Sequence, residues 1–283
     1  MDYKITKERL QNDLLADTLR ALSECYSFIG SEVYVVGAAS RDIALRLLNV
    51  DDLPRRTFDL DVAVALRDWS QYERLSFFML QHHFIKAKEK QRFYYQGENG
   101  ENRYEIDVVP FGEIEENGMI AWPPEGSPVM SVRCFSEVMN CSDKVTVDNT
   151  FSFRLASLSG QFLLKLDAWG DRRLNTKKDV SDIVYILQNV YMAYALSREG
   201  LPQEIDVEAT TFDVVVAGAE WIASDLRLIL SNDNRHFYAD MLQLQVSKEE
   251  TSELLNDMLD VSDSRNYALF RRALTRMSQI LML

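Results

Sequence analysis

The spacing of hydrophobic residues changes near residue 155, and this change constrains the fold more than any other feature of the sequence. Before it, short apolar stretches alternate with longer stretches in which hydrophobic residues recur at helical spacing. The short stretches lie at 33–36, 57–66, 91–96, 103–109, 144–148 and 151–155, and the helical ones at 4–28, 41–48 and 68–82. From residue 156 the spacing is helical almost to the end. We therefore predict an α/β (α+β) domain with a mixed sheet over 1–155 and a helical C-terminal domain over 156–283.

Two segments of the first half are predicted to be loops. Residues 49–56, NVDDLPRR, contain Pro54 and paired acidic residues, which interrupt regular structure. Residues 110–130 are rich in proline and glycine, and the same argument applies to them.

Acidic residues outnumber basic ones, 44 against 31, and the net charge is −13. Proteins that cover nucleic acid with their whole surface neutralise phosphates with Lys and Arg, so this balance argues against such a role. A local basic groove stays open. The main basic run, KAKEKQR at 86–92, favours a solvated strand edge over a site for single-stranded nucleic acid.

Three features bear on the location of the protein. No stretch is apolar over the roughly 20 residues that a membrane-spanning helix needs. The N-terminal segment MDYKITKERL lacks the apolar core of a signal peptide. The three cysteines, Cys25, Cys134 and Cys141, are an odd number at no metal-ligand spacing. We predict a cytoplasmic protein with no membrane partner and no structural zinc.

The stretch TFDLDVAVAL at 57–66 carries two carboxylates on one face of a predicted strand. Asp59 and Asp61 alternate with apolar residues, and residues i and i+2 of a strand point to the same side, about 6.5–7 Å apart. Mg²⁺ is commonly held by one or two carboxylates together with substrate phosphates. The pair is therefore a candidate metal site, although D-x-D pairs also occur on solvated strand edges.

Two neighbours strengthen this candidate. The sequence Gly37-Ala-Ala-Ser40 joins a predicted strand to a predicted helix, and amides at a helix N-terminus bind phosphate. In the alternative, Ser40 simply caps that helix. Asp107 lies on the polar face of the strand predicted over 103–109 and is a candidate third carboxylate, with Glu105 as its rival on the same face.

The run VYVVGAASRDIALRLL followed by RTFDLDV resembles the core of the DNA polymerase β-type nucleotidyltransferase superfamily. Its members carry a strand, a small loop that opens a helix, a strand with two aspartates, and a third acid on a later strand. The pair Arg41-Asp42 resembles a stretch of tRNA-terminal CCA-adding enzymes. The chain departs from the pattern at Ala38, where the superfamily has glycine or serine, and in the longer loop over 49–56.

A second segment, residues 155–187, resembles the AbiEii-like type IV toxin nucleotidyltransferases. The residues that fall on the pattern of that family are Lys165, Arg172, Lys178, Asp179 and Asp182. Lys165 and Arg172 share one face of a predicted helix, where Lys and Arg can contact a triphosphate. Two structural alternatives stay open: Thr176-x-x-Asp179 also fits a capping box, and Arg172 can pair with Asp179 or Asp182.

The two resemblances imply a nucleotidyltransferase-like domain followed by a helical domain, with transfer of a nucleoside monophosphate from an NTP to an acceptor hydroxyl. They imply two Mg²⁺ ions on Asp59, Asp61 and Asp107. The implied nucleotide-binding residues are Gly37, Ser40, Arg41, Lys165, Arg172 and Asp179. The acceptor is an RNA 3′ end, a protein or a small molecule, and an antitoxin or regulatory partner is compatible with the family. Two alternatives stay open: an NTP-binding regulatory protein with weak or no catalysis, and a structural or interaction protein that keeps the fold and uses its acidic residues for surface solvation.

Overall fold

The computed structural model of the chain describes residues 2–50, 59–97, 103–198, 200–263 and 266–283. It divides into an N-terminal unit, Met1–Ser157, and a C-terminal unit, Leu158–Leu283, so the division falls two residues after the expected boundary. The N-terminal unit combines strands with helices and the C-terminal unit is helical, which agrees with the α/β and helical halves expected from the sequence.

The N-terminal unit is built on a mixed eight-stranded sheet in the order β1-β9-β10-β2-β3-β6-β5-β4. The strands are β1 (Asp2–Ile5), β2 (Tyr34–Val36), β3 (Asp59–Leu66), β4 (Phe84–Lys86), β5 (Arg92–Gln96), β6 (Arg103–Gly112), β9 (Asp143–Val147) and β10 (Phe151–Leu155). The central strand β3 pairs in parallel with β6 and antiparallel with β2. Strands β2 and β6 therefore lie on either side of the β3 segment that contains Asp59 and Asp61.

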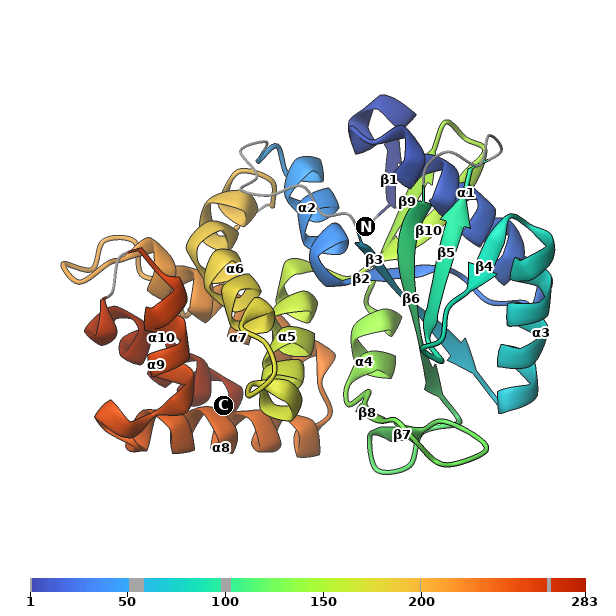
Figure 1. Cartoon of the computed structure of the whole chain (residues 1–283). Coiled ribbons are helices and arrows are strands. Elements are labelled where there is room, and N and C mark those ends of the chain that lie inside the picture. The colour runs from blue at the N-terminus through green and yellow to red at the C-terminus, as the bar shows by residue number, and fades with distance from the viewer. Residues whose placement is uncertain (1, 51–58, 98–102, 199, 264–265) are drawn as a thin grey trace. The chain divides into compact units, whose positions relative to one another are not determined.

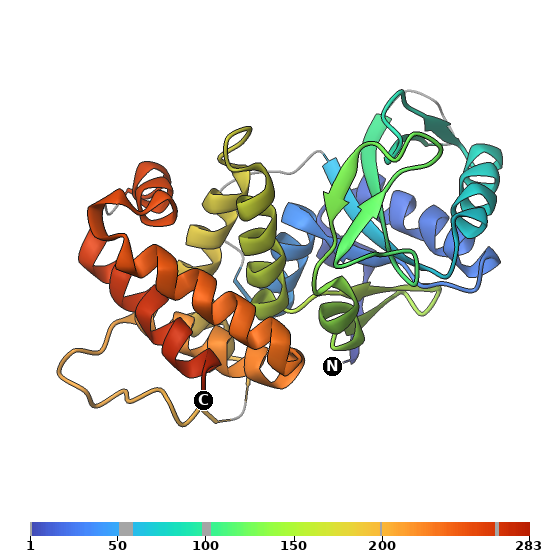
Figure 2. The same ribbon diagram turned by 90° about the horizontal axis from the view of Figure 1, so that it is seen from below.

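Helices α1 (Asp13–Phe28) and α3 (Trp69–Gln81) pack against each other and on this sheet (Figures 1 and 2). Alternate residues of the central strands, Leu60 and Val62 on β3 and Ile106 and Val108 on β6, are fully buried. The helix α2 (Gly37–Leu47) follows β2 without a connecting loop and contacts β3. These apolar side chains of β3 and β6 thus face the core, and the acidic residues that alternate with them lie on the other side of the sheet.

Several expected boundaries are corrected. The helix expected over 4–28 starts at Asp13, where the Asn12 side chain accepts from the backbone N–H of Leu15. Residues 2–5 instead form β1, which pairs in parallel with β9. The helix expected at 41–48 begins at Gly37.

The segment expected to be a loop over 110–130 contains the two-stranded pairing of β7 (Met119–Ala121) with β8 (Val129–Ser131), and a short helix α4 (Phe135–Asn140) follows. Most of the loop expected over 49–56, and residues 57 and 58 of the strand expected before Asp59, lie outside the described residues.

The C-terminal unit contains α5 (Leu158–Arg172), α6 (Lys178–Ala195), α7 (Val214–Ile229), α8 (Asn232–Ser247), α9 (Glu253–Val261) and α10 (Tyr267–Leu281). Helix α10 packs on α7 and α8, and α6 packs on α7 (Figure 2). Gly218 on α7 permits the close packing of α6, because a Cβ there would lie 2.8 Å from Val190 Cγ1 and 2.9 Å from the carbonyl oxygen of Leu187. Within the described ranges, no helix combines the length and apolar character needed to cross a membrane.

Candidate functional site

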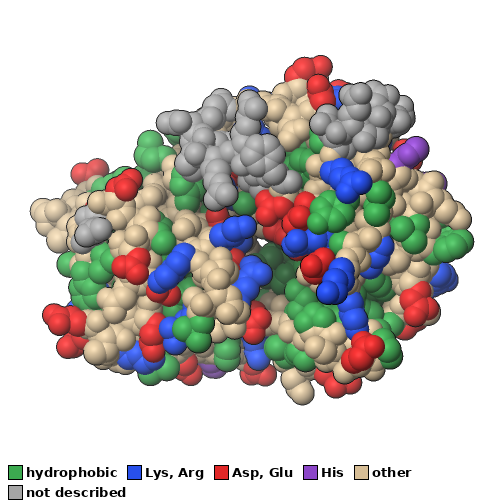
Figure 3. All heavy atoms as spheres, viewed as in Figure 1, with side chains coloured by type: hydrophobic (Ala, Val, Ile, Leu, Met, Phe, Trp, Pro, Cys, Tyr) green, Lys and Arg blue, Asp and Glu red, His purple; other side chains and the backbone are tan. Residues whose placement is uncertain are grey.

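Four carboxylates occupy one face of the pair β3 and β6, and we call this set the acidic face: Asp59, Asp61, Glu105 and Asp107. The parallel register sets Asp59 opposite Glu105 and Asp61 opposite Asp107. Paired residues of neighbouring strands point to the same side of a sheet, and adjacent strands lie about 4.8 Å apart. Figure 3 shows acidic side chains gathered at the surface over the region of β3, with basic side chains beside them. The alternation expected from the sequence therefore brings the predicted aspartates together.

Gly37 lies against the carboxylate of Asp61. Val36, the last residue of β2, is the register partner of Asp61, so the chain turns into α2 directly beside this side chain. Gly37 has a φ of +68°, and a Cβ built on it would lie 2.1 Å from Asp61 Oδ2. Only glycine fits this conformation and this contact. The start of α2, whose dipole favours negative charge, thus meets a carboxylate of the acidic face.

The other predicted residues of α2 are buried. Ser40 is fully buried, and its Oγ has no hydrogen-bond partner within the described ranges. It is the fourth residue of α2, and the N-cap is Val36, so the expectation that Ser40 caps the helix is wrong. Arg41 donates from Nε and Nη2 to Asp42 Oδ1, at 2.9 and 2.7 Å. Arg41 and Asp42 are 7% and 5% exposed.

Arg92 holds two members of the acidic face, a role that the sequence did not indicate. Its Nε and Nη2 donate to Asp107 Oδ1 and Oδ2 at 2.8 and 2.9 Å, and its Nη1 lies 2.9 Å from Glu105 Oε1. The hydrogen bond to Asp107 raises the pKa of the Arg92 guanidinium further above its usual range. The sequence placed Arg92 in a solvated basic run. Its position is decided by the antiparallel register of β5 and β6, in which Arg92 is the partner of Asp107.

The donor set of the acidic face suits a hard divalent cation in its chemistry, since Mg²⁺ prefers carboxylate oxygens. In the described residues, however, no group of three or more His, Cys, Asp or Glu side chains is arranged to hold a metal ion. Asp59 and Asp61 remain a two-carboxylate site of the kind that substrate phosphates complete. A cation at Asp107 would share its oxygens with Arg92, which donates one hydrogen bond to each.

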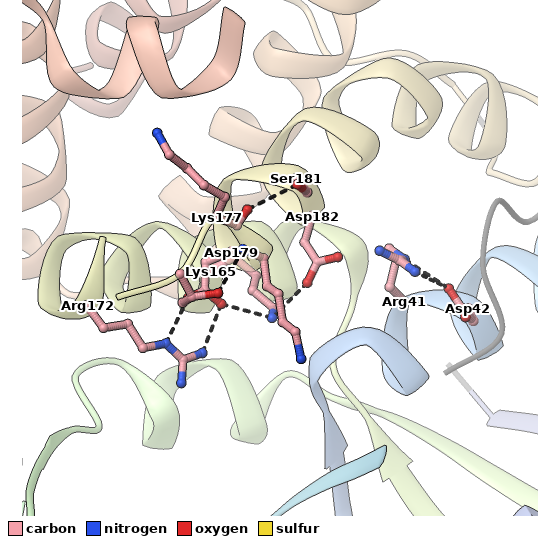
Figure 4. A network of polar contacts seen from close by, with 10 residues as sticks. Arg41, Asp42, Lys165, Arg172, Lys177, Asp179, Ser181 and Asp182 are labelled. Atoms are coloured by element: carbon pink, nitrogen blue, oxygen red, sulfur yellow. Dashed lines mark hydrogen bonds and ion pairs between the residues drawn. The ribbon is translucent and has the colours of Figure 1, made fainter. Parts of the chain in front are cut away.

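The predicted residues of the C-terminal unit form an ion-pair cluster (Figure 4). Lys165 Nζ lies 3.1 Å from Asp179 Oδ1 and 2.7 Å from Asp182 Oδ2. Arg172 donates to both oxygens of Asp179, at 2.8 and 2.9 Å. The Asp179 side chain is 1% exposed. Burial raises its pKa, but the hydrogen bond from Arg172 and the charge of Lys165 outweigh this and hold the pKa below its ordinary value.

This geometry decides between the structural alternatives for Asp179. The N-cap of α6 is Lys177, and the Thr176 hydroxyl accepts only from the nearby backbone N–H of Lys178, at 3.1 Å. The capping box expected at Thr176 is therefore replaced by ion pairing through the Asp179 side chain. The Arg172 side chain stays 49% exposed, whereas that of Lys165 is 14% exposed. Arg172 is thus the more accessible cation of the cluster.

Comparison with known proteins adds no assignment. The chain matches no family model. It also matches none of the curated proteins searched. The function is therefore argued below from the motifs and from the geometry of the site.

Proposed function

We propose that this chain is a Mg²⁺-dependent nucleotidyltransferase that moves a nucleoside monophosphate from an NTP to an acceptor hydroxyl and releases pyrophosphate. The observation that carries the proposal is the contact between Gly37 and the Asp61 carboxylate. It joins the two halves of the expected site, because the start of a helix can bind phosphate and an aspartate on an acidic strand can bind the counter-ion of that phosphate. The proposal includes the nucleotidyltransferase-like fold and the AbiEii-like relationship.

In this proposal the N-terminal unit binds the triphosphate at the start of α2, where backbone amides and the helix dipole favour anions. Asp59 and Asp61 hold Mg²⁺, which when bound neutralises phosphate charge and orients the phosphates for in-line displacement. Asp107 lies next to Asp61 in the register, and it would be the third ligand, of the ion nearer the acceptor hydroxyl. Asp107 then accepts the proton of that hydroxyl.

The helical unit has proposed nucleotide-binding residues of its own. Arg172 is the proposed phosphate-binding side chain of this unit, since it is half exposed and a guanidinium binds phosphate through two nitrogens. Asp179 sets the direction of Arg172 by accepting from two of its nitrogens. Lys165 contributes through its charge, while Asp179 and Asp182 hold its ammonium. We propose Ser40 and Arg41, both on α2, as residues that support the phosphate-binding turn.

The acceptor is proposed by chemical class only: a hydroxyl of an RNA 3′ end, of a protein or of a small molecule. Cytoplasmic location and an antitoxin or regulatory partner belong to the same proposal. A net charge of −13 leans towards an acceptor smaller than a long RNA.

The test is Mg²⁺-dependent NTP binding followed by label transfer. Each α-³²P-labelled NTP is titrated into the protein with and without Mg²⁺, and the labelled fraction of a cell lysate is then identified. We expect Asp59→Ala and Asp61→Ala each to abolish binding and transfer while the circular dichroism spectrum is kept. The exposed α3 residue Glu73, changed to Ala, is the control that loses a carboxylate elsewhere on the unit. Unchanged binding in both aspartate variants would refute the proposal.

A second candidate function is an NTP-binding protein with weak or no catalysis. Two observations favour it: Arg92 occupies both oxygens of Asp107, and Ala38 stands where the superfamily has glycine or serine. This candidate predicts Mg²⁺-dependent NTP binding without label transfer to any lysate fraction. The same experiment therefore separates the two.

A further inference from the structure

Arg92 is placed on the acidic face by the sheet itself. It is the register partner of Asp107 across the antiparallel pair β5 and β6, so the backbone fixes the approach of its side chain. Three of its nitrogens each lie within 3 Å of a carboxylate oxygen, two on Asp107 and one on Glu105. Its side chain is 28% exposed. Such a two-point contact with one carboxylate is the geometry in which Arg binds most strongly.

This contact competes with any cation that uses Asp107. Each oxygen of Asp107 accepts one hydrogen bond from Arg92, so a metal ion at Asp107 would share an oxygen with the guanidinium. A divalent cation would also place two positive charges beside the guanidinium, and like charges at this distance repel. The ion pair and a metal bond at Asp107 therefore oppose each other.

Glu105 gives the displaced side chain a second partner. It lies two residues before Asp107 on β6, on the same face, and contacts a different nitrogen of Arg92. An Arg92 side chain released from Asp107 would therefore keep its contact with Glu105. The guanidinium thus stays beside the site, and its release from Asp107 does not leave it without a carboxylate.

We propose that Arg92 holds Asp107 in the metal-free protein and that a divalent cation bound by Asp61 and Asp107 displaces it towards Glu105. Arg92 is then a positioning residue that sets the metal affinity of the third carboxylate. It withholds Asp107 until the cation, or the cation with its nucleotide, is present. This inference rests on the proposed function, from which it takes the metal site.

The test measures Mn²⁺ binding without nucleotide, from the electron paramagnetic resonance signal of the free ion. Arg92→Gln removes the competing charge, and we expect it to bind Mn²⁺ at least about tenfold more tightly than the wild type. Arg154→Gln is the matched control, because Arg154 is a strand arginine of the same unit that pairs with Glu32. It should leave Mn²⁺ affinity unchanged. Adding Asp61→Asn to Arg92→Gln should abolish the gain.

A conservative variant guards against misfolding. Arg92→Lys keeps the charge but loses the two-point contact, so we expect a gain in Mn²⁺ affinity of roughly threefold. If Arg92→Gln does not fold, this variant decides the matter.

Equal Mn²⁺ affinity in the wild type and the folded Arg92 variant overturns the inference, and so does weaker binding or no binding by the variant. The proposed function is judged separately, by Mg²⁺-dependent NTP binding to the wild type. If the wild type binds NTP with Mg²⁺ and the variant shows no gain, the inference on Arg92 alone fails. If the wild type binds neither NTP nor Mn²⁺ and the variant shows no gain in Mn²⁺ binding, both the proposed function and the inference on Arg92 fail.

Discussion

Replacing Gly37 by alanine tests the contact on which the proposed site depends. The new methyl group would start 2.1 Å from Asp61 Oδ2 and 2.9 Å from Asp61 Cγ. Ordinary contact between carbon and its neighbours begins near 3.5 Å, so the carboxylate or the start of α2 must move by roughly 1 Å. A shift of that size at a metal ligand is enough to disturb binding.

The cost in stability has two parts. The φ of +68° at Gly37 is a left-handed conformation, in which a residue with a Cβ is strained by about 1–2 kcal/mol. Forcing the methyl group against Asp61 adds about 1–3 kcal/mol, the usual cost of overpacking. We expect Gly37→Ala to lower the free energy of unfolding by about 2–5 kcal/mol in total.

Gly30 provides the matched control. Its φ is +71°, and a Cβ there would meet nothing within 4 Å. Gly30→Ala should therefore cost only the backbone strain, about 1–2 kcal/mol. The difference between the two variants isolates the contact with Asp61. In an Asp61→Ala background the carboxylate is gone and only the 3.0 Å contact with the Cβ of residue 61 stays, so this difference should shrink.

The assay is urea unfolding of the four single and double variants, with Mg²⁺-dependent NTP binding measured in parallel. Gly37→Ala should lose NTP binding, and Gly30→Ala should keep it. Two results would refute the reasoning: a cost for Gly37→Ala no larger than for Gly30→Ala, or an excess cost that is undiminished without the Asp61 carboxylate.

Three further predictions concern contacts within the N-terminal unit and within the C-terminal unit. Asp107→Asn should lower the transfer rate more than Glu105→Gln, and the reverse order would make Glu105 the third ligand. Asp179→Asn should lower the free energy of unfolding by about 2–4 kcal/mol near pH 7, because it leaves Lys165 and Arg172 short of a buried partner. The lowered pKa of Asp179 means that its stabilisation is complete above its ordinary pKa near 4 and is lost as the pH falls below that value. Urea unfolding should therefore show a smaller difference from wild type at about pH 3.5 than at pH 7, and an equal difference would contradict the ion pair. Lys165→Ala should lower stability by about 1–3 kcal/mol; unchanged stability with NTP affinity weakened by about 1.5–3 kcal/mol would instead assign Lys165 to the ligand.

The face of the sheet that carries the four carboxylates of the candidate site could be predicted from the sequence. In DLDV and EIDV, acidic and apolar residues alternate with the period of a strand, and burial of Leu60 and Ile106 on one side fixes the carboxylates on the other. The alternation within each strand is enough to assign its buried and its polar side, without knowledge of the neighbouring strands. Which carboxylates become neighbours is decided by the register of β3 and β6, and a single sequence does not contain that register.

The errors arose where structure depends on distant partners. Residues 2–5 join the sheet through β9, whose paired residues lie about 140 positions later, and helical spacing nearby masked this short strand. Arg92 was likewise interpreted from its charged neighbours in the sequence. Its role comes from its position opposite Asp107 on the next strand. In both cases the deciding contact crosses strands, where local pattern carries no information.

The charge balance of the two predicted clusters indicates where a ligand has most to contribute. In the C-terminal unit, the spacing that resembles a nucleotide-binding motif also lets two cations, Lys165 and Arg172, meet the carboxylates of Asp179 and Asp182. The same spacing therefore allows ion pairs within the protein, and these neutralise the charged side chains without a ligand. On the acidic face, Arg92 contacts Asp107 and Glu105, which lie beside Asp61 and Asp59 in the register. Like charges on neighbouring strand positions repel, and a bound cation relieves that repulsion. We therefore expect a cation to stabilise the acidic face.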